Sequence, residues 1–525
     1  MDLFNSFHKA KKSKPSAPEK VEKMPIKTSL NENLGQIKET LGNTNDLLIR
    51  ELALKGVNDI KVAVLGIDGL INTDFAHQFV LHVLAVDMSI IDEKAPKSHE
   101  AAFDLIFESR ISMIDANTSA DFDTLHSNLL NGHVIVLIDG VARFMYFDCK
   151  GWAARSIGEP NSEKSLWGPK DSFVETIRFN TATLRRKIRD SRLRFDTHIV
   201  GKVSKTDVFV AYIEGITNPE FVRIANERIK KIDIDTISST TELIQLIQDK
   251  HHTVLPRLTE TERPDRTAKA LAEGQVAIFV DGSPYVILGP FYFTMAFSAI
   301  DDYYNHPIFA TFKRVMRYLA YFAVILIPGF YIAISTFHQE MIPTSLLITI
   351  INQRSSNPFS TFIEILVIII LFEILREASL RKPDVIGDSM TIVGSLIIGQ
   401  TIVESGLVSY AAIIVGSVTT ISSFLISSSR ISVSARVFSL LFMVVGASFG
   451  LYGITLSFIM LITHISSITS FGQAYLAPLA PFNLADQKDQ LFKLPIWKMK
   501  TRPKILKPLD SVRQGPGNNT HGGDN

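Results

Sequence analysis

Polar side chains inside long apolar runs are the residues of this sequence that could do chemistry. The clearest is Glu364, which lies within an apolar run at 358–375. A charge at the centre of a bilayer costs about 2.5–3.5 kcal/mol or more, so an acid there needs water, an ion or a polar partner. Two interpretations stay open for Glu364: a place on an ion or proton pathway, or a buried acid held by a neighbouring helix.

A charged trio follows at the end of the same run. Glu373, Arg376 and Glu377 stand at helical i, i+3 and i, i+4 spacing. This spacing lets the arginine pair with a glutamate on one face of a helix. A structural ion pair at the cytosolic membrane surface is the interpretation that we favour.

Hydroxyl and small residues form a stripe along a later run, 407–426. At 100° per residue the stripe occupies one narrow arc of a helix, whose members are Ser409, Gly416, Thr420, Ser423 and Ser427. Such a stripe lines a wet path or permits close helix packing, and we favour packing. Gly446, Gly450 and Gly453 form a similar small-residue face in the last run, which also predicts packing.

These residues, with two at the end of the run 385–403, make up the candidate set. The candidate pore or intramembrane polar residues are Glu364, Glu373, Arg376, Glu377, Gln400, Glu404, Ser409, Thr420, Ser423 and Ser427. If copies of the chain enclose a pore, we predict that side chains of the second or fourth span face it, Glu364 and Ser423 first.

The sequence contains no catalytic constellation. It has no phosphate-binding P-loop, no G-x-S-x-G, no H-E-x-x-H and no Cys/His metal spacing. Its one cysteine, Cys149, excludes an intrachain disulfide. We therefore expect no enzymatic activity, no cofactor, and neither catalytic nor metal-binding residues.

Apolar runs of membrane-spanning length begin only after residue 317. Residues 318–337 carry no charge, and 437–485 contain no Asp, Glu, Lys or Arg. Because about 20 apolar residues cross a bilayer as a helix, we expect spans there. The expected spans are 318–337, 358–375, 385–403, 407–426 and a fifth from 437, with 343–351 too short to cross.

Basic residues set the expected topology. Lys313, Arg314 and Arg317 precede the first span and indicate a cytosolic entry. The segment 488–513 carries eight Lys and Arg against two Asp, which places the C-terminal tail in the cytosol as well. An even number of crossings is required, and the last uncharged stretch is long enough for two, so we expect four to six.

The first 300 residues read as mixed α/β with an internal duplication. The run from Ile60 aligns with the run from Asp207, and Asp139-Gly140 aligns with Asp281-Gly282. Chance recurrence of favoured Asp-Gly turns is the alternative, but agreement of both pairs favours two similar subdomains. The fold class is thus a soluble α/β region of two similar subdomains followed by an all-α polytopic membrane domain of four to six helices.

These observations divide the chain into six parts. We expect a disordered basic tail at 1–42, α/β subdomains at 43–160 and 196–300, a basic linker helix at 161–195, the transmembrane domain at 301–482, and a cytosolic basic tail at 483–525 that is disordered at its end.

Several longer stretches resemble one family, the A subunits of GerA-type spore germinant receptors. The resemblance covers about residues 55–503, and its most specific stretches begin at Gly168 (GPKDSFVETIRFNTATLRRKI), Asp301 (DDYY), Tyr331 (YIAISTFHQEMIPTSLL), Phe372 (FEILREASLR), Ile398 (IGQTIVESGLVS) and Ser470 (SFGQAYLAPLAPF). Trp167 and Gln339 depart from the family pattern, which leaves open the nutrient served.

The resemblance implies a multi-pass subunit in the spore inner membrane with both terminal regions cytosolic. Its implied partners are a transporter-like B subunit that binds the nutrient, a lipoprotein C subunit, further A subunits and membrane lipid, with no nucleic acid. It further implies that the oligomer senses nutrients, triggers ion release at germination and contributes to the ion-conducting path.

Two other classes of protein are alternatives. A self-sufficient secondary transporter of ions or small solutes should show inverted repeats among its spans, and none is seen in these. A cytosolic signalling scaffold would need only one membrane anchor. A non-enzymatic receptor subunit that couples nutrient sensing to ion movement therefore fits the sequence best.

Overall fold

The computed structural model describes residues 24–42, 44, 46–53, 60–72, 98–107, 116–148, 158–160, 162–249, 252–355, 357–380, 400, 402 and 404–515. They fall into two compact units, residues 1–153 with 189–191, and residues 154–188 with 192–525. Cys149 and nearly all of the expected third span, 385–403, lie outside the described residues.

The first unit contains a five-stranded antiparallel sheet of order β1-β2-β4-β5-β3. Its strands are β1 (Leu47–Ala53), β2 (Lys61–Ile67), β3 (Ala116–Ser119), β4 (His133–Ile138) and β5 (Phe144–Asp148). Its helices are α1 (Leu30–Leu41), α3 (His99–Leu105) and α4 (Phe122–Leu130). Apolar residues fill β2 and β4, so both central strands are buried almost throughout.

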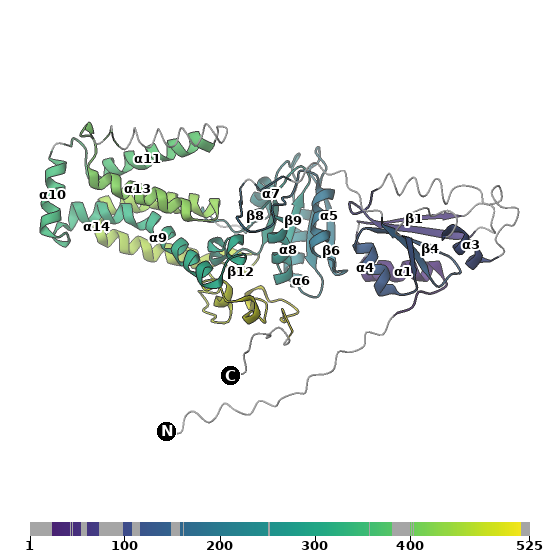
Figure 1. The fold of residues 1–525 in the computed structure, drawn as a ribbon. Coiled ribbons are helices and arrows are strands. Elements are labelled where there is room, and N and C mark those ends of the chain that lie inside the picture. The colour runs from purple at the N-terminus through teal and green to yellow at the C-terminus, as the bar shows by residue number, and fades with distance from the viewer. Residues whose placement is uncertain are drawn as a thin grey trace, which may run out of the picture. The chain divides into compact units, whose positions relative to one another are not determined.

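The second unit begins with a sheet of the same order, β6-β7-β9-β10-β8 (Figure 1). Its strands are β6 (Leu193–Val200), β7 (Thr206–Ile213), β8 (Thr259–Thr261), β9 (Val276–Val280) and β10 (Val286–Gly289). Its helices are α5 (Ile177–Lys187), α6 (Pro219–Lys230), α7 (Thr240–Ile247) and α8 (Pro264–Glu273). The strands aligned by sequence, β2 with β7 and β4 with β9, hold equal places, so the expectation of two similar subdomains is confirmed.

An aspartate after the aligned strand caps a helix in both subdomains. Asp139 accepts a hydrogen bond from the Leu30 N–H at 2.9 Å, and Asp281 accepts one from the Ile177 N–H at 3.0 Å. Leu30 and Ile177 are the first residues of α1 and α5. The carboxylate thereby satisfies one of the backbone N–H groups that a helix start leaves free.

A buried asparagine in the first turn of each of these two helices makes a second pair of equivalent contacts. The Asn33 amide donates to the Lys27 carbonyl at 2.7 Å, and the Asn180 amide donates to the Val174 carbonyl at 2.6 Å. Each asparagine oxygen also accepts the N–H of the same partner. Helix α5 therefore occupies in the second subdomain the place that α1 occupies in the first.

These two helices differ from the sequence-based expectation. Residues 1–42 were expected to be disordered, yet α1 forms within them because Leu30, Leu34 and Ile37 bury an apolar face. Helix α5 was expected in a linker, but it packs into the second subdomain through Ile177 and Leu184. The domain boundaries themselves stay a prediction.

From Pro307 to Ser467 the described part of the second unit is mainly helical (Figure 1), and a two-stranded sheet, β11 (Thr469–Ser470) with β12 (Gln473–Ala474), follows. The long elements of the helical part are α9 (Pro307–Phe337), α10 (Thr344–Arg354), α11 (Thr361–Leu380), α13 (Tyr410–Leu425) and α14 (Ser429–Ser467). Of the described helices, α9 and α14 are long and apolar enough to cross a membrane. The order of an α/β region followed by a helical region is as expected, while four to six crossings stay a prediction.

Helix α14 reverses direction at Gly450. This residue has φ 60° and ψ −147°, a conformation that is essentially restricted to glycine. Gly453 accordingly lies against Val445, eight residues earlier. Gly446 packs on the backbone of Gly329, as the predicted small-residue face requires, but Gly450 forms a turn rather than part of that face.

Both ends of α14 reach the second α/β subdomain. Arg430, in its first turn, forms an ion pair with Glu260 of the β8 strand. His464, in its last turn, lies 2.9 Å from the Thr253 hydroxyl. The chain after α14 therefore returns to the side from which α9 starts.

Helices α11 and α13 run in the same direction. Glu364 near the start of α11 contacts Ser409 at the start of α13, and Ile368 then packs on Gly416. The expected third span lies between these two helices in the sequence and stays a prediction.

Candidate functional site

A small polar cavity lies where α9, α11, α13 and α14 meet. It has a volume of about 30 Å³, enough for one or two waters. Its polar lining residues are Glu373 and Arg376 of α11, Thr419, Thr420 and Ser423 of α13, and Arg436 and Ser439 of α14. The structure thus gathers Glu373, Arg376, Thr420 and Ser423 from the predicted set.

Ion pairs organise one wall of this cavity. Arg376 pairs with Glu373, as the i, i+3 spacing predicts. Arg436 of α14 approaches the same carboxylate at 3.6 Å. The Glu373 side chain is nevertheless 49% exposed, so it also faces outward from the bundle. The third member of the predicted trio, Glu377, lies one turn further along α11.

The hydroxyl groups of α13 bond mainly to their own helix. Thr420 donates to the Gly416 carbonyl at 2.9 Å, and Ser423 donates to the Thr420 carbonyl at 2.7 Å. Ser439 across the cavity is buried, and its hydroxyl has no partner among the described residues. Its free hydroxyl is therefore available to a water or ion in the cavity.

Glu364 lies at the other end of α11 with its side chain fully buried. The Ser409 hydroxyl donates to its carboxylate at 2.8 Å while also accepting the Ala412 N–H as the cap of α13. Asn357 lies beside the same carboxylate, 3.3 Å away. With the amide group of Asn357 rotated by 180°, its nitrogen donates to the Gly406 carbonyl and its oxygen accepts the Ser409 N–H instead. These contacts favour the second interpretation, a buried acid held by a neighbouring helix.

The remaining predicted residues lie elsewhere. Gln400 donates to Glu404 at 2.9 Å on an exposed surface. Ser427 follows α13 and donates to the Ala296 carbonyl at 3.0 Å, which joins the helical region to the chain before α9. Neither group borders the polar cavity.

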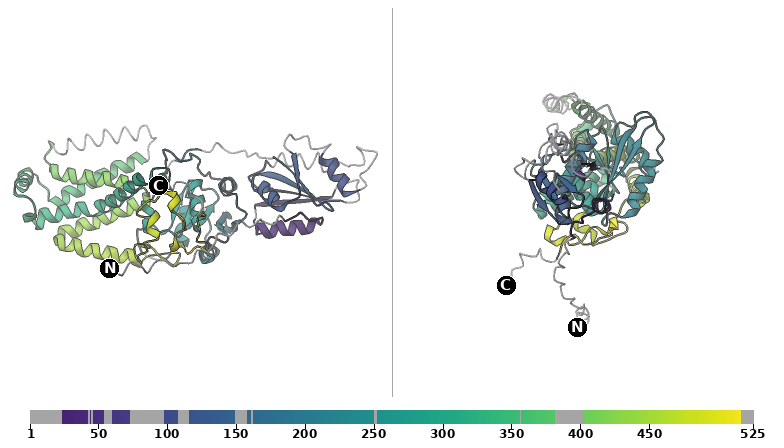
Figure 2. Two further views of the ribbon diagram at one scale, coloured as in Figure 1. Left: turned by 60° about the horizontal axis from the view of Figure 1, so that its bottom comes forward. Right: turned by 90° about the vertical axis from the view of Figure 1, so that its right-hand side faces the viewer.

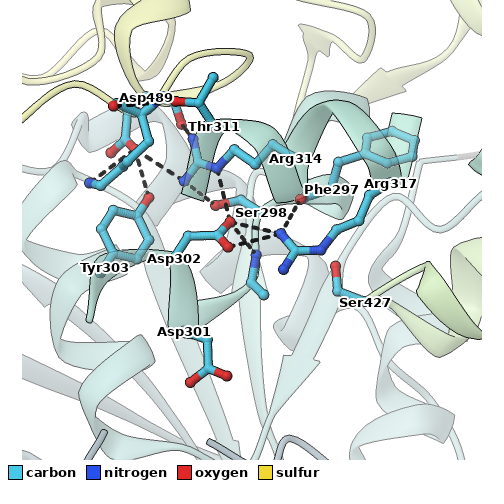
Figure 3. A network of polar contacts seen from close by, with 12 residues as sticks. Phe297, Ser298, Asp301, Asp302, Tyr303, Thr311, Arg314, Arg317, Ser427 and Asp489 are labelled. Atoms are coloured by element: carbon cyan, nitrogen blue, oxygen red, sulfur yellow. Dashed lines mark hydrogen bonds and ion pairs between the residues drawn. The ribbon is translucent and has the colours of Figure 1, made fainter. Parts of the chain in front are cut away.

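A buried charge network that the sequence analysis missed lies at the start of α9 (Figure 3). Asp302, in the short helix η5 (Ile300–Tyr303), is fully buried. Arg314 donates to it at 2.9 Å, and Arg317 donates at 2.8 Å. The two arginines, read from sequence as a basic flank, are thus largely buried partners of one carboxylate, because a buried charge must be paired.

Asp489 brings the C-terminal segment into this network. Its carboxylate accepts a hydrogen bond from Tyr303 at 3.0 Å and lies 3.3 Å from Arg314. Lys493 pairs with it at 3.4 Å. Burial alone would raise the pKa of Asp489, but the surrounding cations hold it below its ordinary value.

Two ionisable groups of α8 complete the network on the α/β side. The Lys269 amine lies on the ring of Tyr303, and burial lowers its pKa to about 7. Burial raises the pKa of the Glu273 carboxyl, which Arg513 approaches at 3.5 Å. Burial also lowers the pKa of Lys493 to about 8. The second α/β subdomain, α9 and the C-terminal segment therefore share one set of coupled charges.

Only one signal in the sequence pointed to this network. Asp301 to Tyr304, the DDYY stretch of the family resemblance, contains both Asp302 and Tyr303. Asp489 is 175 residues from Arg314, so no local pattern joins them.

Comparison with known proteins decides the family. Residues 35–505 match the model described as Bacillus/Clostridium GerA spore germination protein. The chain belongs to this GerA family. The resemblance seen in the sequence is thereby confirmed.

Individual GerA relatives match over nearly the whole chain. Spore germination protein KA of Bacillus subtilis (strain 168) is 36% identical over 497 residues, which cover 95% of this chain and 90% of that protein. Spore germination protein GerLA of Bacillus cereus is 33% identical, covering 93% and 98%. The crystal structure of the N-terminal domain of the A subunit of the Bacillus megaterium spore germinant receptor GerK3 is 31% identical, with a TM-score of 0.41 over 51% of this chain and 97% of that chain.

Proposed function

We propose that this chain is the A-type membrane subunit of a nutrient germinant receptor in the spore inner membrane. In this role it acts with a transporter-like B subunit and a lipoprotein C subunit and triggers germination. The match to the GerA family over residues 35–505 supports the proposal, as do the two helices long enough to cross a membrane.

The proposed topology places the α/β region and the C-terminal segment together in the cytosol. The reversal at Gly450 supports it, because α14 then crosses the membrane twice. The positions of Arg430 and His464 beside the second subdomain agree with that path. With α9, α11, α13 and the expected third span, this gives six crossings.

The exposure of Glu373 supports assembly of several copies around an ion path. Val324 of α9 lines the same cavity and lies six residues into the charge-free stretch that starts at Tyr318. At 1.5 Å per residue this is a depth of about 9 Å. A half-exposed carboxylate at that depth is costly against lipid, so a second copy or an aqueous path is the favourable neighbour.

The proposed path therefore runs along the surface around Glu373. Ser423 and Thr420 offer neutral oxygens behind it, and Arg376 and Arg436 set its charge. Glu364, the first choice from sequence, stays a candidate whose burial suits a structural role better.

The test compares Glu373→Gln and Glu373→Ala in spores that carry this chain with its B and C subunits. Assembly, inner-membrane level and nutrient-triggered cation release are measured for each. We expect normal assembly of Glu373→Gln with at least about tenfold slower release. Glu340→Gln, an exposed glutamate at the other end of the bundle, is the matched control. Wild-type release by both Glu373 variants would remove this residue from the path.

Ser423→Val separates packing from permeation. Ser423 is buried and borders the cavity, and valine adds volume without a hydroxyl. A packing role predicts reduced assembly, whereas a path role predicts normal assembly with altered cation release.

A further inference from the structure

The C-terminal segment after α14 exposes an unusual set of side chains. Phe492, Ile496 and Trp497 are large and apolar, and Ile496 is 65% and Trp497 51% exposed. Lys488, Lys498 and Lys500 are exposed around them. The Lys498 amine lies 4.8 Å from the centre of the Trp497 ring.

The acids of the same segment point inward instead. Asp486 is buried and accepts the backbone N–H groups of Lys504 and Ile505, both at 2.9 Å. Asp489 belongs to the buried network with Arg314. The exposed face of 482–500 is therefore positively charged as well as apolar.

Hydrogen bonds fix the level of this segment along α9. The Lys493 N–H donates to the Thr311 hydroxyl at 3.0 Å. Thr311 lies seven residues before the charge-free stretch 318–337, which is about 10 Å along the helix axis. The headgroup layer extends about 5–8 Å beyond each side of the hydrocarbon core, so Lys493 lies at the aqueous edge of the headgroups if α9 spans the membrane. The Arg314–Asp489 contacts hold the segment there.

The exposed surface of α9 continues the same chemistry. Phe309 and Phe312 are exposed in its first two turns, and the Lys313 amine lies 4.6 Å from the Phe309 ring centre. Tryptophan and aromatic–lysine combinations are typical of the membrane interface, where a ring and a cation both find favourable surroundings. Exposed lysines attract anionic lipid within a Debye length.

We propose that residues 482–500 lie on the headgroup layer of the membrane that α9 enters, with Phe492, Ile496 and Trp497 among the headgroups and Lys488, Lys498 and Lys500 against anionic phosphates. We call residues 482–500 the anchor. This proposal rests on the proposed function, because it requires α9 to span the membrane. It ties lipid contact to the charge network through Asp489 and Lys493, which lie within the same segment.

Fluorescence of the full chain tests the anchor. Trp152→Phe with Trp167→Phe leaves Trp497 as the single tryptophan. The protein is reconstituted in vesicles of phosphatidylcholine and phosphatidylglycerol, some brominated near the headgroup. We expect headgroup-level bromine to quench Trp497 by about two-fold. Replacing Lys488, Lys498 and Lys500 by glutamine should reduce this quenching to the level seen in pure phosphatidylcholine.

Two matched probes in a tryptophan-free background separate failure of the anchor from failure of the span. Ile199→Trp lies on β6, the strand at the opposite edge of the sheet from β8, and should not be quenched. Phe330→Trp, exposed within α9, should be quenched by bromine near the chain ends. If Phe330→Trp is quenched and Trp497 is not, the anchor is wrong while the span stands.

If this surface binds a protein partner instead of lipid, a different result is expected. Trp497 would then stay open to aqueous acrylamide in vesicles of this chain alone and become protected only when the B and C subunits are added. That outcome would overturn the lipid proposal.

Discussion

Arg314 donates a hydrogen bond to Asp302 at 2.9 Å, and neither side chain is exposed. The aspartate precedes α9 and the arginine lies in its third turn, so the pair fixes how the chain enters that helix. The arginine also donates to the Asp489 carbonyl at 2.6 Å. One guanidinium thus connects the entry of α9 with the segment that follows α14. The ribbon in Figure 2 shows this C-terminal segment, in yellow, beside the second sheet.

Asp302→Asn should destabilise the chain severely. The change leaves Arg314 and Arg317 without the carboxylate that they share, and breaking a buried pair costs about 3–5 kcal/mol. Thermal unfolding of the full chain in detergent measures the loss. Asp301→Asn is the control, since Asp301 is partly exposed and the described partner of its carboxylate is the Ser165 hydroxyl. Equal melting temperatures for the two variants would contradict the role given to Asp302.

Asn33→Ala and Asn180→Ala should have matching effects in the two subdomains. Each removes two hydrogen bonds to one backbone segment, at Lys27 and Val174, which costs about 1–3 kcal/mol when the groups stay buried. Hydrogen exchange of the full chain should show faster exchange in α1 for the first variant and in α5 for the second. Asn31→Ala, exposed on α1, should leave exchange unchanged.

The sequence predicts those parts of the fold that repeat or that follow periodicity. The aligned Asp139-Gly140 and Asp281-Gly282 turns predict two similar sheets, because the same turn must end the same strand. The spacing of Glu373 and Arg376 predicts their ion pair. Each of these features depends on residues close together in the chain or on a copied segment.

The sequence does not predict features that depend on distant partners or on one backbone angle. Arg314 and Arg317 resemble an ordinary basic flank until Asp302 and Asp489 are placed beside them. Glu364 resembles a pore residue until Ser409 is seen to hold it. Gly450 is one of three glycines at similar spacing, and only its φ of 60° distinguishes a turn from a packing face.

Stability should rise with pH above neutrality because of two buried lysines. Burial lowers the pKa of Lys269 to about 7 and that of Lys493 to about 8, against an ordinary lysine value of 10.5. At a pH between the lowered lysine pKa values and the ordinary value of 10.5, the unfolded chain binds more protons than the folded chain. The free energy of unfolding therefore increases with pH. One lysine contributes at most about 1.4 kcal/mol per pH unit.

Melting of the full chain in detergent, followed by tryptophan fluorescence, measures this slope between pH 7 and about 9. At higher pH buried tyrosines such as Tyr303, whose pKa burial raises, lower the stability again. Glu273 acts in the opposite sense to the two lysines, because its raised pKa lets the folded chain keep a proton that the unfolded chain has already lost. Lys269→Met should flatten the rise, and Lys488→Met, an exposed lysine of the C-terminal segment, should preserve it. An unchanged slope in Lys269→Met would show that Lys269 is not buried in the charged network.

Gly450→Ala should prevent the reversal of α14. Only glycine adopts its backbone conformation readily, and an added Cβ would lie 2.9 Å from His338 and 3.1 Å from Phe337.

Gly472→Ala is the matched control, because Gly472 also has a positive φ but open space around it, so its cost is about 1 kcal/mol of backbone strain. The readout is labelling of Leu509→Cys, in a Cys149→Ser background, by a membrane-impermeant reagent added to right-side-out vesicles. We expect no labelling in the parent or in Gly472→Ala, because the proposed topology places residue 509 in the cytosol. In Gly450→Ala we expect loss of the protein from the membrane or external labelling, because a continuous α14 carries its end to the other side. External labelling of the parent itself would contradict the even number of crossings.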